Sequence, residues 1–293
     1  MSARLCILTP DPGDFAFDSR WREVVERNAA PLRSAGMTIE ERSWTTADDL
    51  GDFDLVMPLL VWGYVRAYPR WIERIAAWEQ AGVRLQNPAS VLRWNADKSY
   101  LGVLEGKGAP VVPAFYPARL TLEAMEEAAA AFGTDRLVAK PRISHSAWQT
   151  IRWSPGDGLD EGPTGPAIVQ PYLPAIETDG ELSLIWFGGE YSHSVRKVPQ
   201  PGDFRVQPEY DGIITACVPE ADEMEAARTI LAAVEEDLLY ARVDLSRGLD
   251  GEPVLIELEL IEPDLYLGYD PAKGAGFAAA VAQCLDENPP QLD

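Results

Sequence analysis

The stretch VLIELELIE at residues 254–262 constrains the fold more than any other part of this 293-residue sequence. Its apolar content is typical of a buried β-strand, yet Glu257 and Glu259 interrupt it two residues apart. Side chains two positions apart on a strand share a face, so both carboxylates would enter the same side of a sheet. Because burial of an unpaired carboxylate is costly, this strand can be buried only where cations face the two glutamates.

A β-hairpin would add a third carboxylate to this face. Asp250 and Gly251 separate two apolar runs, and the pair Asp-Gly is a strong hairpin signal. If these two residues form the whole loop, Asp244 lies directly opposite Glu257, with Cβ atoms about 4.5–5.5 Å apart. Together with Glu259 this predicts three acids at one place, where opposed like charges would destabilise the sheet unless cations lie between them.

Three converging acids predict a hard metal ion. Oxygen ligands without a nearby His or Cys suit Mg²⁺ or Mn²⁺, and substrate phosphates commonly complete the coordination of magnesium, which points to ATP. Two alternatives stay open at this point: a solvated acidic face paired with Arg242 or Arg247, and the paired carboxylates of a glycoside hydrolase. Glu262 and Asp264 are expected to cap or turn the chain and are not counted as ligands.

Alternation of strands and helices in the first part of the chain predicts a parallel α/β unit. In WIERIAAWEQ, the residues Trp71, Ile75 and Trp78 share one face of an amphipathic helix, and core packing explains them better than stacking on a substrate. The expected strands are residues 4–10, 37–42 and 54–60, and the expected helices are residues 19–34 and 71–80.

From about residue 108 the pattern changes to short helices, hairpins and segments rich in Gly and Pro. This pattern favours α+β subdomains, with a mobile loop after the strand that ends at Lys140 and a hairpin that turns at Gly188-Gly189. We therefore predict an N-terminal parallel α/β domain at residues 1–110, followed by subdomains at 111–170 and 171–293. Further helices are expected at residues 122–132, 220–239 and 274–285, and a further strand at 167–176.

The charge balance narrows the choice of partners. With 25 Lys and Arg against 47 Asp and Glu, the formal net charge of −22 would repel nucleic acid and an anionic membrane surface. Because cations are scarce, individual lysines and arginines become informative. The three cysteines lack a disulfide or metal-ligand spacing, and no export or membrane segment is evident, which favours a cytoplasmic protein. A homodimer is compatible with the sequence, and His193 is expected on a strand surface.

Two lysines extend the pattern beyond the carboxylates. Lys98 lies in NPASVLRWNADKSYL and Lys140 ends the strand RLVAK; each alone would most often be a solvated surface lysine. In order with IVQPYLPAI and the carboxylate hairpin, however, they resemble the ATP-grasp superfamily, and within it the glutathione synthetase-like ligases. The resemblance covers residues 87–269. The phrases LRWNADKSYL and ELELIEPDLYL are similar to the O-ureido-serine cyclo-ligases of cycloserine biosynthesis.

The resemblance implies a role for each of eleven residues. Where many relatives have a glycine-rich loop over the phosphates, this sequence has RISHSAWQT, in which Ser144 and Ser146 could contact phosphate. The residues implied to hold ATP are Lys98 and Lys140 at the phosphates, Gln170, Tyr172 and Leu173 in the linker that reads adenine, and Glu181 near the ribose. Those implied to bind Mg²⁺ or Mn²⁺ are Asp244, Glu257 and Glu259, and Arg196 or Lys197 is implied to lie beside the phosphate and the acyl substrate.

The resemblance also implies a reaction. ATP would phosphorylate a carboxylate, and an amine would then attack the acyl phosphate to form a C–N bond with release of ADP and phosphate. We expect a small amino-acid-like substrate, contacted by Trp62, Tyr64 and Arg66 after the third strand, although aromatic core packing explains these residues equally well. The alternatives are a glutamate ligase that extends a peptide or protein, and an ATP-binding module without ligase activity.

Overall fold

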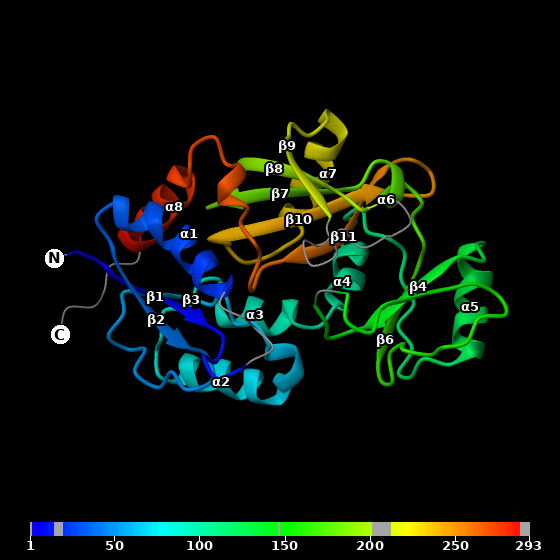
Figure 1. Cartoon of the computed structure of the whole chain (residues 1–293), viewed down its shortest axis with the longest axis horizontal. Helices are drawn as coiled ribbons and strands as arrows, with labels where there is room; N and C mark the ends of the chain where they lie inside the picture. The colour runs from blue at the N-terminus through cyan, green and yellow to red at the C-terminus, as the bar shows by residue number, and fades with distance from the viewer. Residues whose placement is uncertain (1, 15–19, 146, 201–211, 288–293) are drawn as a thin grey trace.

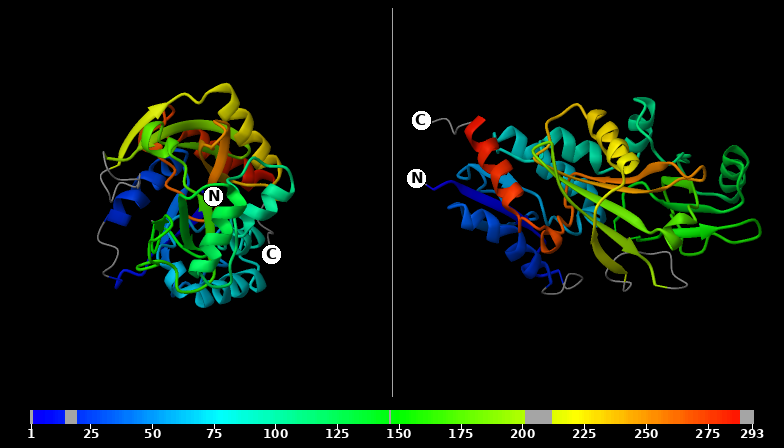
Figure 2. Two further views of the ribbon diagram at one scale, coloured as in Figure 1. Left: turned by 90° about the vertical axis from the view of Figure 1, so that its right-hand side faces the viewer. Right: turned by 90° about the horizontal axis from the view of Figure 1, so that it is seen from above.

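The computed structural model describes residues 2–14, 20–145, 147–200 and 212–287, so Ser146 lies outside the described part of the chain. Three β-sheets follow one another along an elongated molecule, with both termini at one end and the small sheet at the other (Figures 1 and 2). This arrangement combines a parallel α/β part with antiparallel α+β parts, as the sequence pattern predicts.

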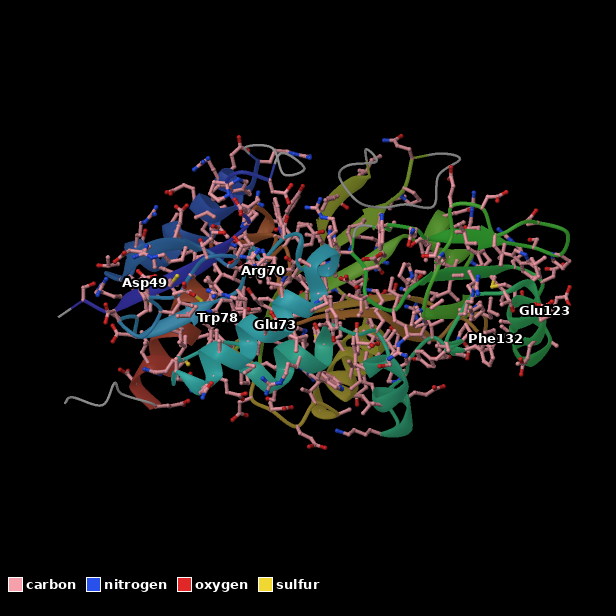
Figure 3. All side chains as sticks on the ribbon, turned by 90° about the horizontal axis from the view of Figure 1, so that it is seen from below. Asp49, Arg70, Glu73, Trp78, Glu123 and Phe132 are labelled. Carbon is pink, nitrogen blue, oxygen red and sulfur yellow. The ribbon has the colours of Figure 1, made fainter. Side chains whose placement is uncertain are left out.

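The N-terminal sheet has the order β2-β1-β3, and all three strands are parallel. Because successive strand residues face opposite sides, Leu5 and Ile7 of β1 pack beneath α1, whereas Cys6 and Leu8 pack beneath α2. The tryptophan and isoleucine stripe of α2 is buried, which confirms the core interpretation, and Figure 3 shows Trp78 within this N-terminal part. The elements are β1 (Arg4–Thr9), α1 (Arg20–Ser34), β2 (Thr38–Ser43), β3 (Leu55–Met57) and α2 (Tyr68–Gln80).

The central sheet is antiparallel in the order β11-β10-β7-β8-β9. Helix α7 packs on it through Ala227 and Ile230. Helix α8, at the C-terminal end, packs through Phe277 between β7 and α1, which joins the central sheet to the N-terminal part. The elements are β7 (Glu181–Phe187), β8 (Glu190–Val198), β9 (Ile213–Cys217), α7 (Ala221–Ala232), β10 (Tyr240–Arg247), β11 (Pro253–Glu259) and α8 (Ala275–Glu287).

The small sheet, in the order β5-β4-β6, is covered by α5, whose residues Glu123 and Phe132 mark the far end of the molecule in Figure 3. Strand β5 lies within the segment that the sequence predicts as a loop. It forms because Ile151 and Trp153 alternate with Arg152 and pair with β4. The elements are α5 (Leu122–Phe132), β4 (Leu137–Pro141), β5 (Ile151–Trp153) and β6 (Ala167–Pro171).

Short helices connect the three sheets. Helix α7 ends at Ala232, seven residues before the predicted end, because the chain must extend to enter β10; the side-chain Oδ1 of Asn87 accepts a hydrogen bond from the backbone of Leu239 at this entry, at 2.8 Å. The remaining helices are α3 (Ala89–Asn95), α4 (Tyr100–Gly106) and α6 (Ala175–Thr178), with 3-10 turns at Tyr64–Ala67 and Leu267–Tyr269.

Candidate active site

The β10–β11 hairpin places Asp244 directly opposite Glu257, as predicted. The predicted two-residue loop is wrong, however, because Arg247 pairs with Pro253 and residues 248–252 form the loop. A β-bulge at Ile256 adds one residue to β11 and so restores the expected pairing beyond it. The bulge therefore aligns the carboxylates of the two strands on one face.

Side chains from residues 87–100, the segment that carries Lys98, form hydrogen bonds with the outer edge of β11. The amide of Asn95 donates to the Leu258 carbonyl at 2.8 Å and accepts from the Leu260 N–H at 3.0 Å. The Tyr100 hydroxyl accepts from the Leu258 N–H at 2.8 Å, and the Asn87 amide donates to the Leu260 carbonyl at 2.8 Å. These hydrogen bonds provide partners for backbone groups at the free edge of β11, and they fix the directions of Glu257 and Glu259.

Each of the three predicted metal acids faces a cation. Lys98 Nζ lies 2.8 Å from Glu257 Oε1. Arg242 donates from Nε to both oxygens of Asp244, at 3.0 and 3.1 Å, and from Nη2 to Oδ2 at 2.9 Å. The same Nη2 pairs with Glu259 Oε1. The sequence analysis considered pairing with Arg242 only for a solvated acidic face. The pairing instead occurs inside the protein, since Arg242 is only 7% exposed.

The three acids differ in the direction in which their pKa values are shifted. Burial would raise the pKa of Asp244, but Arg242 and Lys197 outweigh burial and lower it. At Glu257 burial would also raise the pKa, but Lys98 and Lys140 outweigh burial and lower it. At Glu259 burial prevails over Arg242, and the neighbouring acids add to it, so that its pKa rises to about 8. Glu259 is therefore the acid of the three that holds its proton most tightly when no cation other than Arg242 is bound.

Glu181 and Lys197 face one another across β7 and β8 and form an ion pair. Lys197 Nζ also lies 3.7 Å from Asp244 Oδ1, so this lysine belongs to the cluster. Arg196, one residue earlier, points to the opposite face of the strand, where its Nη2 lies 2.9 Å from Glu223 Oε1 of α7. Of the two basic residues considered for the substrate, the structure brings Lys197 to the site and leaves Arg196 outside it.

Strand β4 and the loop after it supply the remaining predicted phosphate ligands. Lys98 Nζ donates to the Ser144 carbonyl at 2.7 Å, and the Ser144 hydroxyl donates to the Pro141 carbonyl at 3.0 Å. Burial lowers the pKa of Lys140, while Glu257 opposes that shift, so the Lys140 ammonium lies near the cluster. Within the described residues Lys140 forms no ion pair, which leaves its charge available to a phosphate.

The predicted adenine linker follows β6. Gln170 is 6% exposed and its Nε2 donates to the Val112 carbonyl at 3.5 Å, while Leu173 is 4% exposed. The Tyr172 N–H donates to the Arg136 carbonyl at 2.9 Å, and the Arg136 guanidinium lies 4.3 Å from the centre of the Tyr172 ring. The linker is thus a buried, hydrogen-bonded segment beside the strand that carries Lys140.

The oxygen donors suit a hard cation, but the three acids do not contribute equally. In the described part of the chain, no group of three or more His, Cys, Asp or Glu side chains is arranged to hold a metal ion. Asp244 is enclosed by Arg242 and Ser183, with its side chain 3% exposed. The side chains of Glu257 and Glu259 are 31% and 27% exposed, so these two residues fit the role of magnesium ligands.

The segment after β3 borders this cluster. Burial lowers the pKa of His145, and the charges of Lys98, Arg66 and Glu257 also act on it, so His145 lies within electrostatic range of both Arg66 and the cluster. Arg66 Nη2 lies 2.6 Å from Asp14 Oδ2. Tyr64 is 7% exposed and its ring centre lies 5.4 Å from that of Trp71, so core packing accounts for its ring.

Arg242 belongs to the site, although the sequence did not lead us to place it there. It precedes Asp244 by two positions and therefore had to share its face, a signal that the strand period already contained. His193, expected on a strand surface, is instead 4% exposed, and its Nε2 lies 3.0 Å from the Leu265 carbonyl. The segment after β11 lies against the ring and buries it.

Comparison with known proteins identifies relatives of this chain. A family model described as the N-terminal domain of D-cycloserine synthetase DcsG matches residues 7–87. The chain is 30% identical over 276 residues to the cycloserine biosynthesis protein DcsG of Streptomyces lavendulae, covering 86% of this chain and 91% of that protein. The crystal structure of D-cycloserine synthetase DcsG superposes with a TM-score of 0.82 at 26% identity, covering 97% of this chain and 100% of the other.

More distant structures share the fold. D-alanine–D-alanine ligase from Bacillus anthracis has a TM-score of 0.68 at 16% identity, covering 97% of each chain. The ATP-grasp ligase PsnB, in a complex with a precursor variant, Mg and ADP, has a TM-score of 0.65 at 16% identity, covering 96% of this chain and 98% of PsnB.

Fold and site together define an ATP-grasp ligase, an ATP-dependent enzyme that forms C–N bonds. More narrowly, the chain belongs to the family of the cycloserine biosynthesis protein DcsG. No helix in the described ranges is long and apolar enough to cross a bilayer.

Proposed function

We propose that this enzyme closes an amide ring on a small amino-acid-like substrate, with ATP and Mg²⁺ as cofactors and with ADP and phosphate as products. The observation that carries the proposal is the convergence of Lys98 and Lys140 with Glu257 and Glu259 at one junction of the fold. Burying these four charged side chains would be costly unless the lysines bound a polyanion and the glutamates bound a cation. A phosphate chain with magnesium meets both requirements.

The protein's own cations account for phosphate binding. Lys98 is held by Glu257, so a phosphate that takes the lysine would free the glutamate for magnesium. Lys140 needs no such exchange because it has no ion-pair partner in the described residues. Magnesium, when bound, would screen the repulsion between the triphosphate and an anionic nucleophile. Lys197 and Arg242 supply fixed positive charge near the acyl group and need little reorganisation during the reaction.

Ring closure follows from the chemistry that the relative's name implies. D-Cycloserine is a five-membered ring in which the carboxyl carbon of a serine skeleton is bonded to a nitrogen carried by the side-chain oxygen. The open-chain form is an O-amino-serine, which contains both the carboxylate and the attacking nitrogen. We propose that the substrate belongs to this class, which also includes O-amino-serines substituted at nitrogen. Peptide extension and a binding-only role remain outcomes of the test below.

The test measures phosphate release and product mass with ATP, Mg²⁺ and either O-amino-D-serine or O-amino-L-serine, alongside common amino acids and dipeptides. We expect phosphate and a product one water lighter for one O-amino-serine. Glu257→Gln should reduce phosphate release by at least about 100-fold, whereas Glu252→Gln, in the exposed hairpin loop, should not. Product with a dipeptide alone would favour peptide extension, and no product from either O-amino-serine with folded, ATP-bound enzyme would refute ring closure on the unsubstituted substrate.

A further inference from the structure

Glu262 has no role in the site described so far. It follows β11 three residues after Glu259, and its Oε2 is buried with no hydrogen-bond partner in the described structure. The sequence led us to expect that Glu262 and Asp264 cap or turn the chain. Asp264 does so, because its Oδ1 accepts from the Tyr266 N–H at 2.9 Å, but Glu262 does not. Since buried polar atoms are nearly always hydrogen-bonded, an orphaned carboxylate oxygen requires an explanation.

The backbone around Glu262 is rigidly placed. The carbonyl of Ile261 accepts a hydrogen bond from the Tyr240 hydroxyl at 3.0 Å, and the Leu260 N–H donates to Asn95 at 3.0 Å. The Glu262 charge acts on Tyr64 and on Tyr240, which belong to the segment after β3 and to β10. The carboxyl group is therefore held where the N-terminal part meets the central sheet.

Charge pairing sets Glu262 apart from the other site acids. Glu257, Glu259, Asp244 and Glu181 each form an ion pair with a lysine or arginine. Glu262 forms none among the described residues, although Lys98 is near enough to act on it. Burial raises its pKa well above the ordinary value, and the nearby Glu259 adds to the rise. A cationic ligand at this place would both satisfy the oxygen and favour the ionised form.

We infer that Glu262 binds the ammonium group of the amino-acid-like substrate. This inference rests on the proposed function, because it places the substrate between the segment after β3 and the acids of β11. An ammonium ion matches a single carboxylate, since one charge-assisted hydrogen bond satisfies the orphaned oxygen and pairs the two charges. Magnesium is already assigned to Glu257 and Glu259, and no group of three or more acids in the described residues is arranged to hold a second metal ion at Glu262. Glu262 is thus a specificity residue that selects an α-amino acid over the corresponding des-amino acid.

The experiment compares wild-type enzyme with Glu262→Gln by calorimetric titration in the presence of Mg²⁺ and a non-hydrolysable ATP analogue. The ligands are D-cycloserine and isoxazolidin-3-one, the same ring without the amino group. We expect Glu262→Gln to weaken D-cycloserine binding about 10- to 100-fold and to leave isoxazolidin-3-one within about 2-fold. Asp264→Asn, which alters an exposed carboxylate two residues away, is the matched control and should change neither affinity.

Three results would overturn the inference. Equal weakening of both ring ligands by Glu262→Gln would indicate a general effect on the pocket. Weaker Mg²⁺ binding in this variant, without any ligand, would assign the carboxylate to the metal. If wild-type enzyme binds neither ring, the ring-closing function fails first, and the comparison is repeated with any amino acid that stimulates ATP hydrolysis. In that case an unchanged KM for the amino acid in Glu262→Gln refutes the role of Glu262 by itself.

Discussion

Replacing Arg242 by Met should destabilise the protein more than any exchange of a surface arginine on the same strand. Arg242 makes three hydrogen bonds to Asp244, at 2.9 to 3.1 Å, and Asp244 is almost fully buried. Removing one partner of a buried ion pair typically costs about 3–5 kcal/mol. Lys197, 3.7 Å from Asp244, offsets part of this cost. Glu259, the other partner of Arg242, can take a proton because its pKa is about 8.

We therefore expect a loss of about 3 kcal/mol for Arg242→Met, or roughly 5 °C in Tm for a chain of this size. Urea denaturation followed by tryptophan fluorescence measures it. Arg247→Met is the matched control on β10. Arg247 pairs with Glu220 and Asp222, whose side chains are 71% and 45% exposed, and the buried Glu223, 3.7 Å away, keeps its closer partner Arg196 in this variant. Such pairs contribute less than about 1 kcal/mol. Equal destabilisation by the two variants would refute the assignment of Arg242 as the cation that holds the buried acids.

Other predictions concern the strand anchor, a buried histidine and a phosphate ligand. Asn95→Ala should cost about 2–4 kcal/mol in denaturation, because two backbone groups of β11 lose their partner; Arg93→Ala, at an exposed pair, should cost far less. Burial lowers the pKa of His193 more than Asp270 raises it, so wild-type stability should fall as pH drops below about 6.5, and His193→Gln should show a smaller fall. Lys140→Met should weaken ATP binding at least about 10-fold in calorimetry, whereas Lys107→Met, at a surface pair, should not.

Local patterns were sufficient to predict much of the fold. The continuous apolar run of β1 predicts two buried faces, and the stripe of Trp71 and Trp78 predicts a helix for one of them, so a parallel α/β unit follows from short-range information. The end of α7 did not follow, because the chain leaves the helix to meet the side chain of Asn87, far away in sequence. Contacts of that kind leave no local signal.

The candidate site was predictable to the extent that it depends on strand period. Asp244 opposite Glu257 is correct, although the bulge at Ile256 and the longer loop compensate for one another, and neither has a sequence signature in an apolar run. Arg242 could have been placed in the site by the same period of two. The exclusion of Arg196 also follows from that period once Lys197 is placed inside. The orphaned oxygen of Glu262 was not predictable, because satisfaction of a buried group depends on every neighbour in three dimensions.

Transfer of oxygen from substrate to phosphate tests the central claim most directly. The enzyme is incubated with ATP, Mg²⁺ and O-amino-serine that carries ¹⁸O in its carboxylate, and the released phosphate is analysed by mass spectrometry. If the carboxylate attacks ATP and the nitrogen then displaces phosphate, one ¹⁸O atom must leave with each phosphate. We predict phosphate with a single ¹⁸O in step with ring product. Ring product accompanied by unlabelled phosphate would contradict an acyl-phosphate ligase at this site.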